Sequence, residues 1–415
     1  MHKYLKVNKI TFITLINILV LIFPLSLLRH EMTGLLVITL MSFMGLVILY
    51  IKKDNICKIK FIQFIFFIFF PSFILIFLVH INIDTGIQFN TLNLALYQSL
   101  LCPLVAYCIY NANLSHKIFI TGIKVSLILV GLWIIYHNIQ ADYPRILWSS
   151  RFGALLLAFT FIEAKNSKED KFDIFLSFLS LIVATNSIIL SGDRLTFLTL
   201  IPLLILVFTI NRIYLTRVDQ IKKNYIYLFL TFLIIFISFQ GNQTMKERLT
   251  EVNLNLVETL IEKEAYEPQA LHNSSILQRG ILFKSGFKSI KEKPLFGHGF
   301  DNVHTELTKH YPIEYNDHPF LLRITHAHNS FINITIASGF FGLLILIGNY
   351  FLIPLVLFIK YLKIKKRESL YASLGIILLT GYGFLSTGET MYLGIAETSF
   401  FVFFISYCLA NIYKK

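Results

Sequence analysis

Long apolar segments, divided by short polar ones, set the pattern of this 415-residue chain. The segments recur from one end to the other, and each is about as long as the roughly 20 residues with which a helix crosses a bilayer. We place twelve predicted spans, at residues 10–28, 33–51, 60–80, 91–111, 117–137, 147–163, 172–191, 194–210, 224–240, 329–360, 369–387 and 391–412. The pattern predicts an all-α polytopic membrane protein.

One long polar segment interrupts the series between the ninth and tenth predicted spans. It divides the chain into residues 1–240 with spans 1–9, a loop domain at residues 241–328, and residues 329–415 with spans 10–12. In the loop domain, Thr244–Tyr266 has apolar residues near helical spacing with charges between them, which predicts an amphipathic helix. Ser274–Asn302 begins with serines that can cap a helix and predicts a second one.

Proline and glycine mark two further breaks. Pro294, followed by Gly297 and Gly299, predicts that the second loop helix stops in a tight turn. The apolar stretch after the loop domain is long for one span, and Gly339 and Gly342 interrupt it. Since glycine permits bends and close helix contacts, this stretch predicts a tilted or kinked helix.

Composition agrees with this membrane assignment: 55% of the residues are hydrophobic, with 40 Phe and a mean hydropathy of +0.67. A soluble protein of this length needs more polar side chains on its surface. The net charge of +13 does not indicate nucleic acid, because of where the charges lie. With the N-terminus inside, 22 basic residues fall at cytoplasmic ends and loops, against four in the short outer loops. The positive-inside rule then predicts cytoplasmic termini and an outer, periplasmic loop domain.

Histidines gather in the outer loop domain, which contains seven of the twelve. A wet polar surface accounts for most of them. The spacing of His326 and His328 could chelate a metal in an extended segment, but no cysteine and no HExxH pattern supports zinc, so we expect no metal. Asn329 and an apolar helix follow His328 directly. A histidine there could take a proton from a hydroxyl at the membrane surface, or be a solvated interface residue.

Arginines stand at the outer ends of the spans. Arg194 lies where two apolar stretches leave room for a minimal turn, a depth at which a guanidinium needs an anion. Asp193 could be that anion, and phosphate is the alternative, since guanidinium donors match phosphate oxygens in pairs. Arg279 lies on the second predicted loop helix, and Arg145 and Arg151 flank another outer edge. Together they suggest an anionic lipid headgroup, although each could be an interfacial snorkelling residue.

Two acidic residues stand out near the last two spans. Glu389 lies in the outer turn between them, and Glu397 lies within the apolar start of the last span. A carboxylate at such a depth must be paired or face a cavity. Either glutamate could orient a histidine or pair with an arginine, and a transporter would also show such a group.

The order of these features resembles the bacterial O-antigen ligase and O-antigen polymerase superfamily. An arginine ends a span (Ser191–Arg194), a large outer loop follows with "KPLFGHGFDN" (Lys293–Asn302), and "HAHNSFINITIASGFFG" (His326–Gly342) opens the next span. The resemblance implies a GT-C-type glycosyltransferase of the inner membrane that needs no metal or other cofactor. It implies that His328 is the catalytic base, that Arg194 and Arg279 bind diphosphate, and that His326 is optional.

The resemblance implies an undecaprenyl-diphosphate-linked O-antigen donor at the periplasmic face. The ligase passes glycan to the lipid A-core oligosaccharide of lipopolysaccharide, whereas the polymerase passes it to another lipid-linked repeat unit. One large outer loop after the ninth span favours the ligase. A transporter, such as a flippase for lipid-linked oligosaccharide, would explain twelve spans and Glu397, but not a large outer domain rich in His and Arg.

Overall fold

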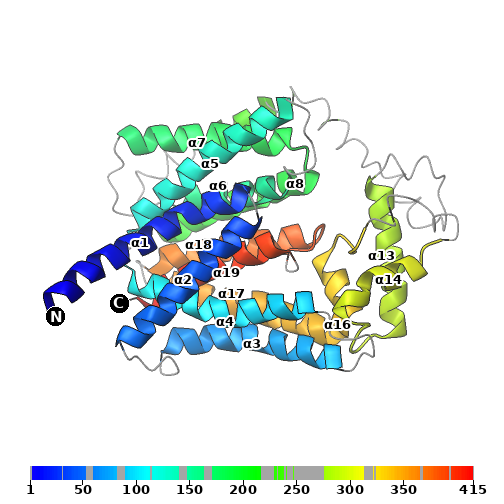
Figure 1. Ribbon diagram of the computed structural model, residues 1–415. Helices are drawn as coiled ribbons and strands as arrows, with labels where there is room; N and C mark the ends of the chain where they lie inside the picture. Colours follow the sequence, from blue (N-terminus) through cyan, green and yellow to red (C-terminus); the bar gives the residue numbers. More distant parts are fainter. Residues whose placement is uncertain are drawn as a thin grey trace.

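Helix is the one type of regular secondary structure among the residues that the computed structural model describes (Figure 1). These are residues 2–29, 31–52, 59–81, 89–112, 115–139, 147–162, 171–215, 275–312, 324–364, 368–391 and 394–414, with a few isolated positions at 229–246 and at 321. The helices are α1 (His2–Arg29), α2 (Glu31–Lys52), α3 (Lys60–Ile81), α4 (Phe89–Asn111), α5 (His116–Ile139), α6 (Leu147–Thr160), α7 (Lys171–Leu190), α8 (Arg194–Ile210), α13 (Ser275–Glu292), α14 (Val303–Lys309), α16 (Ser330–Ile345), α17 (Ile353–Ile364), α18 (Glu368–Ser386) and α19 (Ile395–Tyr413).

Seven helices in the described residues are long and apolar enough to cross a membrane. They are Thr33–Lys52, His116–Tyr136, Phe172–Leu190, Arg194–Ile213, Ser330–Lys363, Ser369–Ser386 and Ala396–Tyr413. Four shorter apolar helices coincide with the predicted spans 10–28, 60–80, 91–111 and 147–163. Of the remaining predicted span, 224–240, the structure describes residues 229, 230, 232–237 and 240, all of them helical. The chain is a polytopic helical membrane protein.

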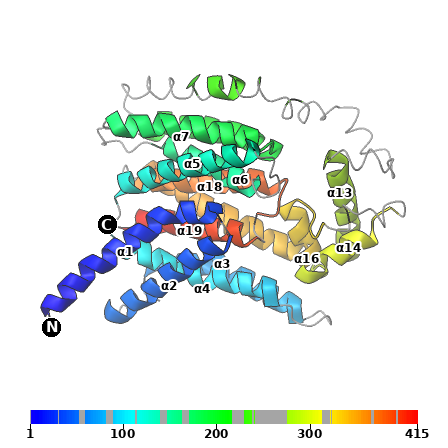
Figure 2. The ribbon, with the colours of Figure 1, turned by 45° about the horizontal axis from the view of Figure 1, so that its top comes forward.

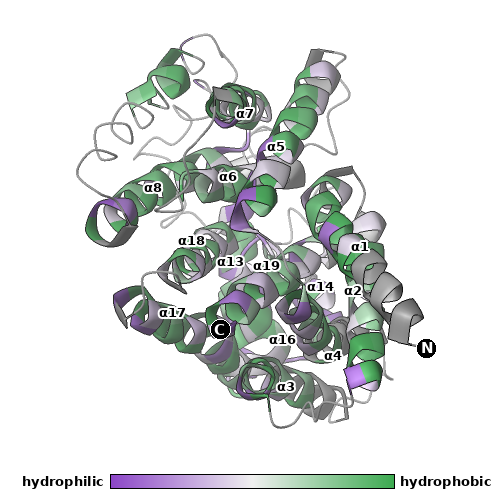
Figure 3. Ribbon diagram, turned by 90° about the vertical axis from the view of Figure 1, so that its left-hand side faces the viewer, coloured by the Kyte–Doolittle hydropathy of each residue, from purple (hydrophilic) through white to green (hydrophobic). Residues whose placement is uncertain are grey.

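The long helices lie side by side, and both ends of the chain are at the same end of the bundle (Figures 1 and 2). At the opposite end, α13 and α14 stand apart from the bundle, with α13 crosswise to the long helices. Figure 3 views the bundle from the end with the termini and shows that hydrophobic residues dominate its helices. Many of the outward ones, such as Phe43, Phe175 and Val356, are exposed, which suits contact with acyl chains.

α18 and α19 are the most enclosed of the spans. Phe403 of α19 stacks on Phe23 of α1, and Phe400 stacks on Phe152 of α6. Since lipid tails provide no hydrophobic drive between helices, such close packing is what joins them. The turn between α18 and α19 is therefore anchored by two firmly packed helices.

α16 breaks at Gly339, whose φ of 66° and ψ of −166° suit glycine alone. The turn after α13 fits into this break and supplies the missing backbone partners. His298 and Gly299 donate their backbone N–H groups to the carbonyls of Ile336 and Ala337, both at 2.8 Å, and Phe340 donates to the carbonyl of Pro294 at 2.8 Å. The predicted kink is confirmed at Gly339, whereas Gly342 continues as helix.

The predicted helix at Ser274–Asn302 is present as α13, and it ends before Pro294 as expected. A second hydrophobic core joins α13 and α14 to the first half of α16 through Leu282, Leu307 and Ile336, among others. The predicted amphipathic helix at 244–266 lies outside the described residues, apart from Lys246. The division of the chain at residues 240 and 328 stays a prediction.

Candidate active site

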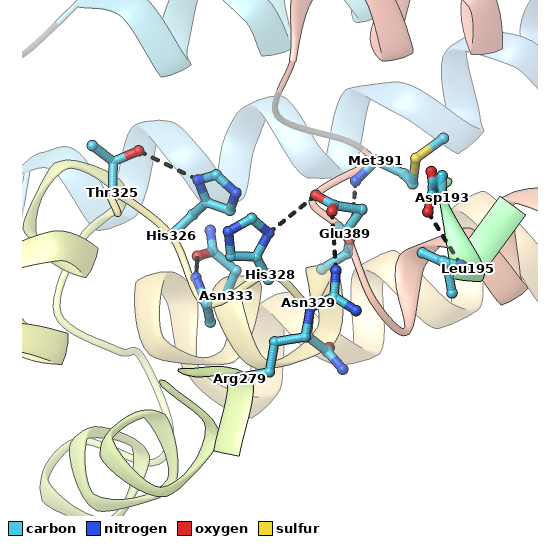
Figure 4. A network of polar contacts seen from close by, with 12 residues as sticks. Asp193, Leu195, Arg279, Thr325, His326, His328, Asn329, Asn333, Glu389 and Met391 are labelled. Atoms are coloured by element: carbon cyan, nitrogen blue, oxygen red, sulfur yellow. Dashed lines mark hydrogen bonds and ion pairs between the residues drawn. The ribbon is translucent and has the colours of Figure 1, made fainter. Parts of the chain in front are cut away.

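Several chain segments meet at the end of the bundle that faces α13, and each brings a charged or titratable residue (Figure 4). The start of α16 brings His328, and the turn between α18 and α19 brings Glu389. α6 brings Arg151, and the turn between α7 and α8 brings Asp193. α13 brings Arg279. A hydrogen bond or ion pair links each of these side chains to another of the group.

Asn329 and Ser330 join the start of α16 to the turn that carries Glu389. The Asn329 side chain caps α16 by accepting from the backbone N–H groups of Phe331 and Ile332, at 2.9 and 3.0 Å. It also donates to the carbonyl of Thr387 at 2.9 Å. The Ser330 hydroxyl donates to the carbonyl of Glu389 and accepts from the backbone N–H of Met391, both at 2.8 Å. The asparagine of the motif therefore fixes the position of the histidine before it.

His328 adopts an unusual backbone conformation. In the described part of the chain it is the one residue other than glycine with a positive φ, at 49°. Such a conformation costs about 1–2 kcal/mol, and strain of this kind gathers at functional sites. The capped helix after it and the Asn333 side chain, which accepts from the backbone N–H of Ala327, hold the segment in place.

The His328 ring contacts Glu389 through Nδ1, which lies 3.2 Å from Oε2 (Figure 4). An ionised carboxylate can only accept, so the Nδ1–H group donates. In the neutral ring this arrangement leaves Nε2 with a lone pair and no proton, the form that a general base requires.

Glu389 is buried, and burial alone would favour its neutral form. The hydrogen bond from His328 and the charges of Arg151, His328 and Arg279 outweigh burial and lower the pKa of the Glu389 carboxyl to about 2. Glu389 is therefore an anion at any physiological pH. It was one of two glutamates for which the sequence suggested either of these partners, and the structure shows it with a histidine and two arginines.

The two arginines on Glu389 differ in how firmly they are held. Arg151 donates to Asp193 from Nε at 3.0 Å and pairs with Glu389 at 3.0 Å, and its side chain is 10% exposed. The charge of Glu397 also acts on it. Arg279 has a longer contact with Glu389, 3.5 Å, and its side chain is 36% exposed. Arg151 is thus paired with carboxylates inside the protein, whereas the more exposed Arg279 side chain can be reached by an anion from outside.

Arg194 opens α8 directly after Asp193, whose side chain caps that helix. The next residue, Leu195, packs against Gly388, beside Glu389, where even a Cβ at the glycine would come within 2.9 Å of it. The start of α8 therefore adjoins the turn that holds Glu389. Asp193, which the sequence suggested as a partner of Arg194, pairs with Arg151.

His326 lies beside His328, with the ring centroids 4.4 Å apart, and Thr325 contacts its Nδ1 at 3.3 Å. Burial, followed by the neighbouring His328, lowers the pKa of His326 to about 4. His326 is therefore neutral at neutral pH. Arg145, which the sequence placed among the supporting arginines, lies outside the described residues.

The site suits an anion better than a cation. One atom each from His326, His328 and Glu389 lies within 4.8 Å of the others, a spacing that a metal ion could use. However, both oxygens of Glu389 already meet His328 or a guanidinium. Positive groups this close repel a further cation. The sequence suggested that Glu389 could pair with an arginine, but it did not identify Arg151 or the contact of Arg151 with Asp193, because segments far apart in the sequence form these contacts.

Part of the chain is similar to a known protein family. Residues 179–347 match the family model described as O-Antigen ligase. The matched region begins within α7 and ends just after α16. It includes Arg194 of α8, Arg279 of α13 and His328. No curated protein matches the chain. The resemblance to the O-antigen ligase and polymerase superfamily is confirmed over this region.

Proposed function

We propose that this protein is an O-antigen ligase, which transfers polysaccharide from undecaprenyl diphosphate to the lipid A-core oligosaccharide of lipopolysaccharide. The observation that carries the proposal is the contact of His328 with Glu389. The accessible side chain of Arg279 contacts the same carboxylate. A proton acceptor and a phosphate-binding group thus lie together where a lipid-linked donor would present its reactive bond.

The reaction would proceed by inversion without a metal at the reacting bond. Nε2 of His328 takes the proton from the acceptor hydroxyl while that oxygen attacks the anomeric carbon. The bond between this carbon and the diphosphate oxygen breaks, and the electron pair leaves with undecaprenyl diphosphate. Arg279 and Arg194 stabilise the negative charge that grows on the diphosphate, because a guanidinium group can donate two parallel hydrogen bonds to phosphate oxygens.

Glu389 would act as a positioning residue in this reaction. By accepting from Nδ1–H, it holds the ring in the tautomer with a free Nε2 and stabilises the imidazolium that forms. His326 would remain neutral beside it and add no second positive charge. Asn329 would position the histidine, and Arg151 and Glu397 would support the site from inside the protein.

The membrane arrangement that we propose is a GT-C-type enzyme of the inner membrane with twelve spans. Both termini would be cytoplasmic, and the loop domain and the active site would face the periplasm. The location of the termini at the end of the bundle opposite α13 supports it (Figure 1). The charge distribution supports it as well, since 22 basic residues fall at the predicted cytoplasmic ends and loops, against four in the short outer loops.

An O-antigen polymerase is the alternative within the same chemistry, because it differs in its acceptor alone. The single large outer loop favours the ligase. A flippase is the alternative of another class. Transporters tend to bind substrate near the middle of the membrane, and the location of this site at one end of the bundle favours an enzyme (Figure 1).

The test is the lipopolysaccharide banding pattern of a deletion strain that carries either the wild-type protein or His328→Ala. For a ligase, the variant loses the whole O-chain ladder while lipid-linked polymer accumulates. A core with a single repeat unit would instead indicate a polymerase, and blocked export of lipid-linked units would indicate a flippase. Lys288→Ala, at an exposed position of α13 outside the site, is the control and should keep the ladder. An unchanged ladder with His328→Ala would exclude this histidine as the base.

A further inference from the structure

A run of six exposed residues, Lys291–Phe296, leads from the end of α13 into the turn that fills the break in α16. Leu295 and Phe296, the apolar pair of this run, are 56% and 63% exposed. Lys291 and Lys293, the lysine pair, precede them. Exposed apolar side chains next to basic ones are typical of a segment that meets a membrane surface. Nothing in the proposed transfer reaction uses these four residues.

The level of the bilayer follows from the apolar stretch Ser330–Lys363, which has 34 residues. One helix of that length would be about 50 Å long, well beyond a hydrocarbon core of about 30 Å. The part before Gly339 is mostly buried in protein, whereas exposed apolar side chains recur after it, from Phe340 to Ile359. By the helical rise these two residues lie about 28 Å apart, which matches the hydrocarbon core. One boundary of the bilayer therefore falls at the break in α16.

The apolar pair is joined to the first lipid-facing residues after this break. Phe341 donates its backbone N–H to the carbonyl of Leu295 at 3.3 Å. The ring of Phe296 stacks on the ring of Phe341, with the centroids 5.1 Å apart. Phe341 is itself 46% exposed. The apolar pair therefore lies at the level where α16 enters the hydrocarbon, and its exposed surface continues the lipid-facing surface of that helix.

The charges beside the turn favour an anionic surface. Glu292 is the one carboxylate in the run, and it pairs with Lys309 at 2.7 Å. The lysine pair therefore sets the charge of this edge. Positive charge on the outer side is compatible with the topology, because long loops cross the membrane largely regardless of charge. Lysine stems can lie along apolar surface while their ammonium groups reach the headgroups.

We propose that the apolar pair inserts into the outer leaflet and that the lysine pair binds the phosphates of anionic phospholipids beside it. α13 lies crosswise to the long helices, and so along the plane of the membrane (Figures 1 and 2). An anchor at its end would fix the height above the bilayer of the helix that presents Arg279. The anchor is independent of the transfer reaction, and the proposed topology decides only which leaflet it enters.

The test of insertion is the depth of a fluorophore on single cysteines, in the full chain with Cys57 replaced by serine. The protein is placed in nanodiscs of phosphatidylethanolamine and phosphatidylglycerol. A label on Phe296→Cys should be quenched by lipids with a nitroxide near the top of the acyl chain, because interfacial segments insert about 5–10 Å. Quenching by aqueous iodide should be lost. Leu295→Cys should behave alike, and it keeps the stacked ring of Phe296.

Two positions calibrate the measurement. Thr305→Cys, at an exposed position of α14, should be quenched by iodide and not by the labelled lipids. Val356→Cys, at a lipid-facing position of α17, should be quenched by the labelled lipids and not by iodide. Size-exclusion elution of each variant shows whether it folds.

The test of the lysine pair compares two nitroxide-labelled lipids as quenchers of the label on Leu295→Cys. Phosphatidylglycerol should quench more than phosphatidylcholine, because it carries a net negative charge. Lys291→Gln together with Lys293→Gln should lower this preference by about 5-fold or more, since each lysine near an anionic surface contributes roughly that factor. Lys360→Gln together with Lys363→Gln, at the other end of the lipid-facing stretch, should leave the preference unchanged.

Three results would overturn the proposal. Iodide quenching at both positions of the apolar pair, as at Thr305→Cys, would mean that the turn stands in water. Protection from both iodide and labelled lipids would mean that protein covers the turn. Equal quenching by the two lipids, with the lysine pair intact, would remove the role of the lysines. None of these measurements needs glycan transfer, so a failure of the ligase function would leave the anchor standing.

Discussion

Arg151 and Arg279 contact the same oxygen of Glu389, yet their removal should have different effects, one on stability and the other on activity. Arg151→Gln leaves Asp193 and Glu389 buried without their cation, which should lower the free energy of unfolding by about 3–5 kcal/mol. Arg279→Gln removes a half-exposed side chain and should change stability by about 0.5 kcal/mol or less. It should, however, slow glycan transfer by roughly 100-fold or more, because it removes a charge from the leaving diphosphate.

Thermal unfolding in detergent and transfer by purified protein measure these two effects. Equal losses of stability in the two variants would contradict the different roles that their burial suggests. Full transfer activity in a folded Arg279→Gln protein would exclude Arg279 from the diphosphate site.

Glu389 offers a test of positioning rather than of binding. Glu389→Gln keeps the size of the side chain but can no longer hold Nδ1–H of His328 as an ion does. We expect kcat to fall by about 10²–10⁴-fold, with a much smaller change in the KM for the lipid-linked donor. Asp173→Asn removes a carboxylate at the opposite end of the bundle and should leave kcat unchanged. A variant that loses donor affinity and keeps kcat would assign Glu389 to binding instead.

His326 predicts a pH dependence of stability. Its pKa falls from 6.5 to about 4 in the folded chain, so the unfolded chain takes up a proton first as the pH drops. The stability due to the neutral ring is present above about pH 6.5 and is lost towards pH 4, up to about 3 kcal/mol. The unfolding temperature of the wild type should fall over this range, and that of His326→Gln should fall less. Identical pH profiles for the two proteins would contradict it.

At the scale of elements, the join between α16 and the turn after α13 depends on two glycines. Gly339 has a positive φ, and a Cβ there would overlap the carbonyl group of Leu295. A Cβ at Gly297 would lie 2.5 Å from backbone atoms of Ala337 and Ser338. Backbone atoms cannot move aside as a flexible side chain does. Gly339→Ala should therefore cost about 3 kcal/mol or more and lower the yield of folded protein.

Gly348 provides the matched control for this prediction. It lies in the π-helical segment Leu346–Leu352 after α16, and a Cβ there meets nothing within 4 Å. Gly348→Ala should leave stability unchanged or raise it slightly. The measurement is thermal unfolding of both variants in the same detergent. If both variants unfold like the wild type, the turn does not need to fit into the break in α16.

The contact between the turn after α13 and the break in α16 shows which features could be predicted from the sequence and which could not. Glycine and proline predicted both the turn after α13 and the kink of α16, because each residue type limits the backbone locally. That the turn fills the kink could not be predicted, since it depends on hydrogen bonds between Pro294–Gly299 and Ile336–Phe341. The site shows the same division. His328 and Arg279 follow from short motifs, whereas their contacts with Glu389 join residues 61 and 110 positions apart.

At the scale of the whole molecule, the direction of the chain across the membrane can be tested with cysteines. Lys288 of α13 and Lys363 of α17 are both exposed, and we propose that they lie on opposite sides. Three of the natural cysteines, Cys102, Cys108 and Cys408, are buried in the bundle. With Cys57, outside the described residues, replaced by serine, the background of labelling should be low.

A maleimide that cannot cross the inner membrane provides the measurement, in cells with a permeabilised outer membrane. Lys288→Cys should be labelled in intact cells, because α13 would lie with the active site in the periplasm. Lys363→Cys should be labelled only after lysis, because the end of α17 belongs to the basic cytoplasmic side. The reverse result would place the site where no periplasmic acceptor could reach it, and the ligase function would fail with the topology. Labelling of both residues in intact cells would contradict the assignment of α16 and α17 as one span through the bilayer.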